Sequence, residues 1–293
     1  MKVLILVSNS TFYPSNLIVP FIKKTWGKDK RVDTIYYEGG GEEVTFKNNV
    51  LKLDVSSTSE KVNEKGIKAF RWVLENRDFD FVFRCTTTTY LNIDRLLRFL
   101  DDKKTKNFFC GPVDYYPPLN IPQDQKIMFV SGAGCFFSKD VLETFMQNIE
   151  KYDESLNDDV GISKLLISDL GIKVTEGYRQ DFYDGYPFMN NIDFSNYHFR
   201  FKLSPNYYPR YLEIITLLSI HVRRKLIDRA IYAPIIWIVD TFLFLLFRLF
   251  RLFNLNFVKY KSESIFNKLK KLVVQLAQKT PILVKINKSL KNR

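Results

Sequence analysis

The sequence predicts an α/β domain of about 200 residues followed by a basic, helical extension. Short apolar runs alternate with helix-length patterns in the first region, which is the rhythm of a mostly parallel sheet with crossover helices. The 293 residues and 46% hydrophobic content are enough for one large core. From residue 204 the strand-like alternation stops, and long helix-compatible stretches follow. We therefore expect one domain over residues 1–203 and a separate region over residues 204–293.

Each strand of the first region is expected where a short apolar run occurs, over residues 3–7, 32–37, 79–84, 129–131 and 172–174. Helical patterns separate these runs, over residues 17–26 and 61–75, from Ser138 onward and over residues 158–170. Ser138 suits a helix start, and Gly171 suits a helix end because glycine readily adopts the left-handed conformation found there. Residues 197–202 alternate aromatic with basic side chains, so they predict a last strand with His198, Arg200 and Lys202 on one face.

The positive charge of the chain is confined to its second region. Residues 1–203 hold 27 Lys and Arg against 28 Asp and Glu, whereas residues 204–293 hold 17 against 4. A nucleic-acid partner would need a reading module, which the sequence does not display. An anionic membrane surface needs only basic residues beside apolar ones, so we expect the tail to bind a membrane and no nucleic acid.

Two segments of the tail carry this expectation. Residues 230–247 are almost entirely apolar with basic residues on both sides, and their length is borderline for a membrane-spanning helix. Because the two flanks are similar, a helix that lies in the membrane plane or re-enters it is favoured. Residues 265–286 place apolar residues at helical spacing between lysines, which is typical of an amphipathic basic helix. The alternative is that both helices pack on the first domain.

The cysteines indicate a reducing compartment. Cys85, Cys110 and Cys135 are odd in number and lack CxxC spacing or a clustered histidine, so neither a disulfide framework nor a zinc site is expected. The apolar run after Met1 is too short for a signal peptide and matches a buried strand. The sequence therefore predicts a cytoplasmic protein that is peripherally bound to a membrane, or anchored to it through the C-terminal region.

Four segments along residues 3–202 combine a strand or helix end with polar residues suited to chemistry. They are Ser8-Asn9-Ser10 with Ile22-Lys23-Lys24-Thr25-Trp26-Gly27, then residues 80–96 with Thr86-Thr87-Thr88, then Ser131-Gly132-Ala133-Gly134, then Asn157-Asp158-Asp159-Val160-Gly161. The order and spacing of these segments resemble motifs of the Fringe and β-1,3-galactosyltransferase family. Its members are glycosyltransferases.

The resemblance implies a fold and a reaction. The fold is a GT-A type, Rossmann-like domain that binds a nucleotide-sugar, here with a C-terminal helical extension. The reaction is an inverting transfer of a sugar from a UDP-sugar donor to a glycan or glycolipid acceptor. In the family an acid of the fourth segment is the catalytic base, which aligns with Asp159, and Asp158 is the second candidate. The alternative is that both acids only stabilise a helix start.

The second segment departs from the family pattern. Thr86, Thr87 and Thr88 stand where the family has acids that bind a divalent ion, such as Mn or Mg, which clamps the donor diphosphate. Threonine hydroxyls are poor substitutes for carboxylates, so the metal requirement is in doubt. Thr88 and His198 occupy metal-site positions of the family, and Arg200 and Lys202 are expected to neutralise the diphosphate directly if no metal binds.

Ligands of open α/β sheets bind beyond the carboxyl ends of the strands. With the resemblance, this rule predicts the donor-binding residues Ser8, Asn9, Ser10, Arg84, Thr86, Thr87, Thr88, Gly132, Gly134, His198, Arg200 and Lys202. Glycines are included because they let backbone amides approach a ligand closely. Two other functions remain open: a catalytically degenerate binding or scaffold protein at a membrane, and a metal-assisted sugar-nucleotide hydrolase that would use acids such as Asp94 and Asp114.

Overall fold

The computed structural model describes residues 1–12, 14–117, 122–183, 192–203, 210, 212–226, 240–242, 244–245 and 248–249. The chain forms two compact units, one of residues 1–180 with 195–200 and one of residues 181–194 with 201–293. The expected boundary near residues 203–210 lies mostly outside the described residues and stays a prediction.

An eight-stranded sheet forms the centre of the first unit, with the strand order β11-β7-β10-β5-β1-β2-β4-β3. The strands are β1 (Val3–Ser8), β2 (Asp33–Glu38), β3 (Thr45–Lys47), β4 (Val50–Lys52), β5 (Phe81–Thr86), β7 (Phe109–Gly111), β10 (Gly134–Ser138) and β11 (Val174–Glu176). Strand β1 is parallel to β2 and β5, β2 is parallel to β4, and β7 is parallel to β11. Strand β10 runs antiparallel to both β5 and β7, so the sheet is mixed.

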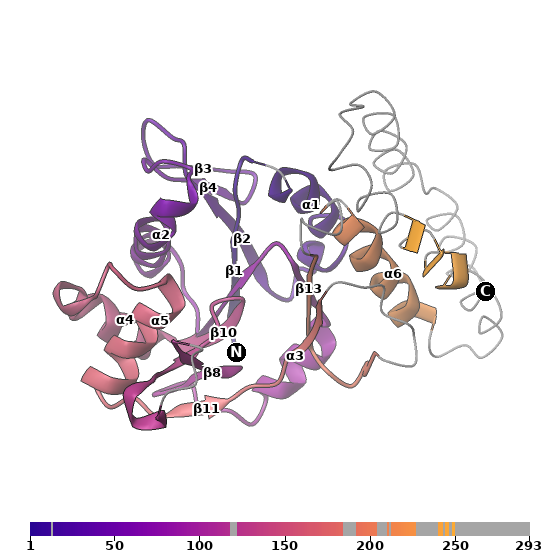
Figure 1. The fold of residues 1–293 in the computed structure, drawn as a ribbon. Coiled ribbons are helices and arrows are strands. Elements are labelled where there is room, and N and C mark those ends of the chain that lie inside the picture. The colour runs from indigo at the N-terminus through magenta and orange to yellow at the C-terminus, as the bar shows by residue number, and fades with distance from the viewer. Residues whose placement is uncertain are drawn as a thin grey trace, which may run out of the picture. The chain divides into compact units, whose positions relative to one another are not determined.

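Helices cover both faces of this sheet (Figure 1). Those of the first unit are α1 (Ser15–Ile22), α2 (Val62–Asn76), α3 (Ile93–Leu100), α4 (Lys139–Gln147) and α5 (Asp158–Ser163), which continues as a π-helix over Lys164–Asp169. Strand β1 is apolar from Val3 to Val7 and its side chains point alternately to the two faces of the sheet, so Leu4 and Leu6 pack in the core cluster that contains Phe70 of α2 and Phe145 of α4. Figure 1 shows α2, α4 and α5 on one side of the strands and α1 and α3 on the other.

Shorter elements complete the unit. Short 3₁₀ helices occur at Trp26–Lys28, Ser59–Lys61, Gln123–Gln125 and Ile149–Lys151. Strands β8 (Val113–Tyr116) and β9 (Ile127–Val130) form an antiparallel pair, and residues 198–200 of β13 (His198–Lys202) pair with β6 (Thr89–Leu91). Between β3 and β4, Asn48 and Asn49 both have positive φ, which gives the tight turn a two-residue hairpin needs.

The α/β class with a central sheet is confirmed, and so are the predicted strands over 3–7, 32–37 and 79–84, to within two residues. Gly171 ends the 158–170 helix with φ of 68°. The helix expected from Ser138 onward begins at Lys139, but the segment before it was not predicted as a strand. It forms the buried strand β10, because Phe136 and Phe137 supply apolar side chains to both faces of the sheet. The expected 172–174 strand begins two residues later, at Val174.

The second unit contains β12 (Gln180–Tyr183) from Asp181 onward, the end of β13 and α6 (Leu212–Leu226). The rings of Phe182 and Phe201 stack with centroids 4.7 Å apart. Residues 240–242, 244–245 and 248–249 are helical. Most of the expected 230–247 helix and all of the 265–286 helix lie outside the described residues. Within the part of the chain that is described, no helix has the length and apolar character needed to cross a membrane.

Candidate active site

The carboxyl ends of β1, β2 and β5 bring together the first group of predicted donor residues. Ser8 is in register with Tyr37 of β2 on one side and Thr86 of β5 on the other. The next residue, Asn9, donates its amide to the Tyr37 carbonyl at 2.9 Å. Ser8 and Asn9 therefore lie at the edge of the sheet where the topology of an open α/β fold places ligands.

Glu38 was missed by the sequence reasoning, although it ends β2 next to Asn9. The side-chain amide of Asn9 donates to the Glu38 carboxylate, and its buried Oδ1 has no hydrogen-bond partner among the described residues. Three glycines follow, and Gly40 adopts φ of 90°. The signal was the Glu38-Gly39-Gly40-Gly41 run after an apolar strand. Ser10 lies beyond this pair and accepts the Phe12 amide at 3.2 Å.

The threonine turn, Thr86 to Thr88, connects β5 to β6. The hydroxyls of Thr86 and Thr88 lie 2.9 Å apart and share a hydrogen bond, while Thr87 pairs with Ser15 of α1 at 3.3 Å. These neutral hydroxyls therefore form hydrogen bonds with one another and with a residue of α1. Hard divalent cations prefer charged oxygens, so the turn does not fit a Mn or Mg ion.

The acid cluster consists of Arg84, Asp158, Asp159 and the glycine turn formed by residues 131–134. Arg84 is 3% exposed on β5, two residues before the threonine turn, and its guanidinium forms an ion pair with Asp158 at the start of α5. Its Nε donates to the Tyr37 hydroxyl at 3.4 Å. Its Nη1 has no hydrogen-bond partner among the described residues. The buried guanidinium of Arg84 is therefore held in place by Asp158 and Tyr37.

Asp159 is held between α5 and the glycine turn. Its Oδ2 accepts the Gly132 amide at 3.0 Å, and its Oδ1 accepts the Val160 amide at 3.1 Å. Burial, and then the neighbouring charge of Asp158, raise the pKa of the Asp159 carboxyl above its ordinary value. Both acids also accept first-turn amides, since Asp158 binds the Asp159 amide at 3.0 Å. Both acids thus stabilise the helix start, which is the alternative role that the sequence left open.

The two glycines of the turn make room for protein side chains. A Cβ at Gly132 would overlap the Arg84 guanidinium and lie 3.0 Å from the Asp159 Cβ. A Cβ at Gly134 would fall on the imidazole of His198. The Gly132 amide is already bound by Asp159, and the Gly134 amide donates to the Ser131 carbonyl at 3.1 Å. The expectation that these glycines offer free amides to a ligand does not match this geometry.

His198 is fully buried on β13, with its ring against Gly134 and edge-on to Phe83 at 5.3 Å. Burial, and then the charges of Arg179 and Arg200, hold the pKa of its imidazole well below the ordinary value. Neither ring nitrogen has a hydrogen-bond partner in the part of the chain that is described. A neutral ring enclosed in this way does not fit the family's role as a metal ligand beside the threonine turn.

The other predicted cations differ in their surroundings. Arg200 is half-buried on β13, whereas Lys202 is exposed and belongs to the second unit. Arg179 was not predicted, and it donates to the Ser131 hydroxyl of the glycine turn at 2.9 Å. Asp94 pairs with Arg31 at 2.7 Å. Over the described residues, no group of three or more His, Cys, Asp or Glu is placed to hold a metal ion.

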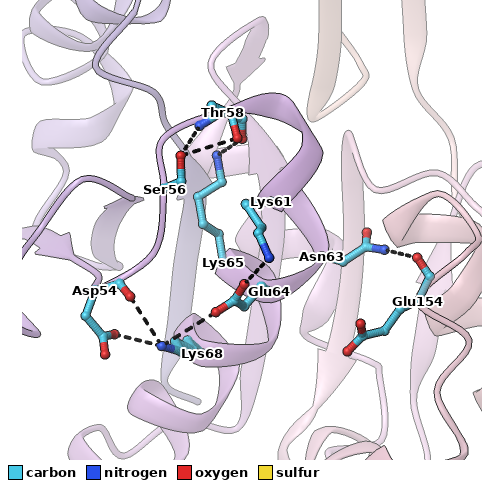
Figure 2. Close-up of polar contacts among 9 residues, drawn as sticks. All are labelled: Asp54, Ser56, Thr58, Lys61, Asn63, Glu64, Lys65, Lys68 and Glu154. Carbon is cyan, nitrogen blue, oxygen red and sulfur yellow. Dashed lines mark hydrogen bonds and ion pairs between the residues drawn. The ribbon is translucent and has the colours of Figure 1, made fainter.

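Helix α2 braces the loop that leads to the two acids. Asn63 donates to the carbonyls of Glu154 and Leu156 at 3.1 and 3.0 Å, and Figure 2 shows the first of these contacts. Lys65 is 5% exposed and donates to the carbonyls of Ser57 and Thr58 at 3.3 and 3.1 Å. Burial lowers the pKa of the Lys65 amine, and the charge of Asp158 opposes that shift. These two side chains thus connect α2 with the loop that precedes α5 and with residues 57–58.

No protein-family model matches the chain, and no curated protein matches it by sequence. Among solved structures, it is similar to the galactosyltransferase LgtC in complex with donor and acceptor sugar analogs. The identity is 11%, the alignment covers 69% of this chain and 88% of that one, and the TM-score is 0.42.

Two further structures have similar scores. The mannosyltransferase PcManGT from Pyrobaculum calidifontis, in complex with GDP-Man and Mn2+, is 11% identical over 96% of this chain and 81% of that chain, with a TM-score of 0.39. The 4-diphosphocytidyl-2C-methyl-D-erythritol synthase from Anaerococcus prevotii is 12% identical over 60% and 86%, also with a TM-score of 0.39. Scores this low carry no argument about the reaction, which therefore rests on the residues themselves.

Proposed function

We propose that this protein is a glycosyltransferase that moves a sugar from a nucleotide-sugar, a UDP-sugar, to a hydroxyl of a glycan or glycolipid acceptor with inversion. The observation that carries the proposal is the placement of Asp159. Its carboxylate lies at a helix start beside a glycine turn, is partly exposed, and has a raised pKa. A carboxylate tuned toward neutral pH is the chemistry that a general base requires.

In the proposed step, Asp159 accepts the proton of the acceptor hydroxyl. The hydroxyl oxygen forms a bond to the anomeric carbon of the donor sugar as the bond from that carbon to the diphosphate oxygen breaks. The electron pair of the broken bond leaves with the nucleoside diphosphate. Attack from the side opposite the leaving group inverts the anomeric centre.

The nucleoside is proposed to bind at Ser8, Asn9 and Glu38. An acid at the end of a second parallel strand can accept hydrogen bonds from ribose hydroxyls, which are paired donors of matching reach. The buried Oδ1 of Asn9, which no other described residue binds, supplies a second acceptor at the same edge. Thr86 lies directly across from Ser8 and extends this surface toward the sugar.

The departing diphosphate requires positive charge. Arg179 and Arg200 are both half-buried. Arg179 donates to the Ser131 hydroxyl of the glycine turn, and Arg200 lies on β13 two residues after His198, whose ring packs on that turn. We propose that these two guanidinium groups neutralise the diphosphate, because arginine binds phosphate oxygens in a bidentate manner. Arg84 instead fixes Asp158, and through it the start of α5.

The experiment is a panel of nucleotide-sugars, scored by thermal stabilisation and by slow donor hydrolysis, with and without manganese. Asp159→Asn is isosteric and is expected to retain donor stabilisation while losing turnover by about 10²- to 10⁴-fold. Asp169→Asn changes an exposed acid near the end of the same helical segment and is the matched control. It should behave like the wild type.

Two results would count against the proposal. Equal turnover in the wild type and Asp159→Asn would remove Asp159 as the base. Stabilisation by a nucleotide-sugar without turnover, for every acceptor class tried, would favour the degenerate binding protein that the threonine turn also suggests.

A further inference from the structure

The described helical residues 240–242, 244–245 and 248–249 have two unlike faces. Phe242, Leu245 and Leu249 are 64%, 53% and 50% exposed. At about 100° per residue these three side chains fall within an arc of about 60° on one side of a helix. Large apolar side chains are rarely left this exposed in a row on a soluble surface, so the row requires an explanation.

The opposite face is anchored within the same unit. Asp240 is 4% exposed and forms an ion pair with Arg223 of α6, which is 2% exposed. Phe244 lies on the same side as Asp240, and the Arg248 guanidinium sits 5.6 Å from its ring centroid. The rotation of the helix is therefore set by a buried charge pair, and the apolar row is directed away from that pair.

The net charge of residues 204–293 is positive, which favours a negatively charged partner. Residues 204–293 carry 17 Lys and Arg against 4 Asp and Glu. Two of those four acids, Glu213 and Asp240, are buried and paired with Arg210 and Arg223. Setting these two pairs aside leaves 15 basic residues against 2 acids, so the net charge of this region stays at +13. Arg248 lies exposed beside the apolar row.

We propose that Phe242, Leu245 and Leu249 form a docking face that inserts into the interface of an anionic lipid bilayer. Apolar side chains at helical spacing with flanking basic residues match the chemistry of such an interface, where the chains enter the acyl boundary and the cations remain among the headgroups. Each basic residue near the surface adds attraction to anionic lipid that falls as salt rises. The proposal is independent of the transfer reaction.

The test is co-sedimentation of the full-length protein with vesicles of phosphatidylcholine alone or mixed with phosphatidylglycerol. We expect binding to the mixed vesicles that weakens with salt. The triple variant Phe242→Ser, Leu245→Ser and Leu249→Ser should bind them roughly tenfold more weakly or worse. The matched control replaces two exposed apolar residues of the first unit, Val44→Ser and Tyr178→Ser, which are 44% and 58% exposed, and should bind like the wild type.

A second measurement does not depend on the triple variant. In Phe242→Trp, the added indole should be quenched by brominated lipid in the mixed vesicles, whereas it stays unquenched if this face remains in water. Equal vesicle binding by the triple variant and the wild type would overturn the proposal. The proposal would also be overturned by the following result: light scattering shows that the wild type is a dimer and the triple variant a monomer, and neither protein binds vesicles.

Discussion

The acid cluster and the threonine turn both include residues of strand β5, yet their polar side chains differ in charge and in pairing. Arg84 and Thr86 are two residues apart on β5 and lie on the same side of the sheet. Around Arg84 the polar groups are ionised, buried and matched in charge, whereas around Thr86 they are neutral hydroxyls that pair with one another. The buried positive charge on this strand is therefore a covalent part of the chain, and it is paired with Asp158.

The largest expected effect comes from breaking the acid cluster. Arg84→Met leaves the partly buried Asp158 without its partner and should lower the free energy of unfolding by about 3–5 kcal/mol. Urea unfolding followed by circular dichroism measures this change. Arg31→Met is the control, because Arg31 also contacts two carboxylates but its side chain is 52% exposed, and a loss below about 1 kcal/mol is expected there. Similar losses in both variants would contradict the contrast.

Glycine substitutions test the packing of the turn. Gly134→Ala places a methyl group on the enclosed His198 ring and should destabilise the protein by about 2–3 kcal/mol. Gly66→Ala, in the middle of α2, meets no atom within 4 Å and should stabilise by about 0.5–1 kcal/mol. Thermal melts of the two variants should therefore move in opposite directions from the wild type. A neutral Gly134→Ala would show that the ring can move aside.

The pH profile of transfer sharpens the roles of the two acids. The base must be ionised, so kcat/KM should fall as the pH drops through the raised pKa of Asp159, above the value of about 4 of an ordinary aspartate. Asp158→Asn removes a negative neighbour that raises this pKa and leaves Arg84, which lowers it. The acid limb should therefore shift to lower pH. An upward shift would exclude Asp159 as the titrating group.

The smallest effect is expected in the threonine turn. Thr86→Val and Thr88→Val keep the side-chain shape and remove one hydrogen bond between neutral groups, so each should cost about 0.5–1 kcal/mol of unfolding free energy. The double variant should lose about as much unfolding free energy as either single variant, because all three proteins lack the same hydrogen bond. Chemical denaturation of the three proteins measures this. Losses as large as that of Arg84→Met would remove the distinction between the regions.

The sequence predicted the sheet better than the site. Uninterrupted apolar runs such as residues 3–7 indicate a buried strand, and the amphipathic pattern of residues 61–75 indicates a helix, so both were found. Strand β10 was missed because Gly132 and Gly134 indicate a turn while Phe136 and Phe137 decide the outcome through burial. Local composition cannot weigh those two signals against each other.

Within the site, the neighbours of Asp159 depend on contacts between distant parts of the chain. Asp158 meets Arg84 across 74 residues, and Gly132 meets Asp159 across 27. The spacing of residues along the chain does not encode such contacts, so the occupied amide of Gly132 could not be foreseen. The enclosed ring of His198 has the same origin. Glu38, in contrast, could have been found from the acid that precedes three glycines.

The three buried cysteines can report on local opening of the central sheet. Cys85, Cys110 and Cys135 are free thiols with exposures of 0%, 0% and 2%, and burial raises the pKa of Cys110 and Cys135 to about 12. A thiol-specific reagent can therefore react only during excursions that expose β5, β7 or β10. The rate of alkylation under native conditions would count those excursions without any added label. Native-state thiol labelling would thus measure how often the central strands of this sheet open.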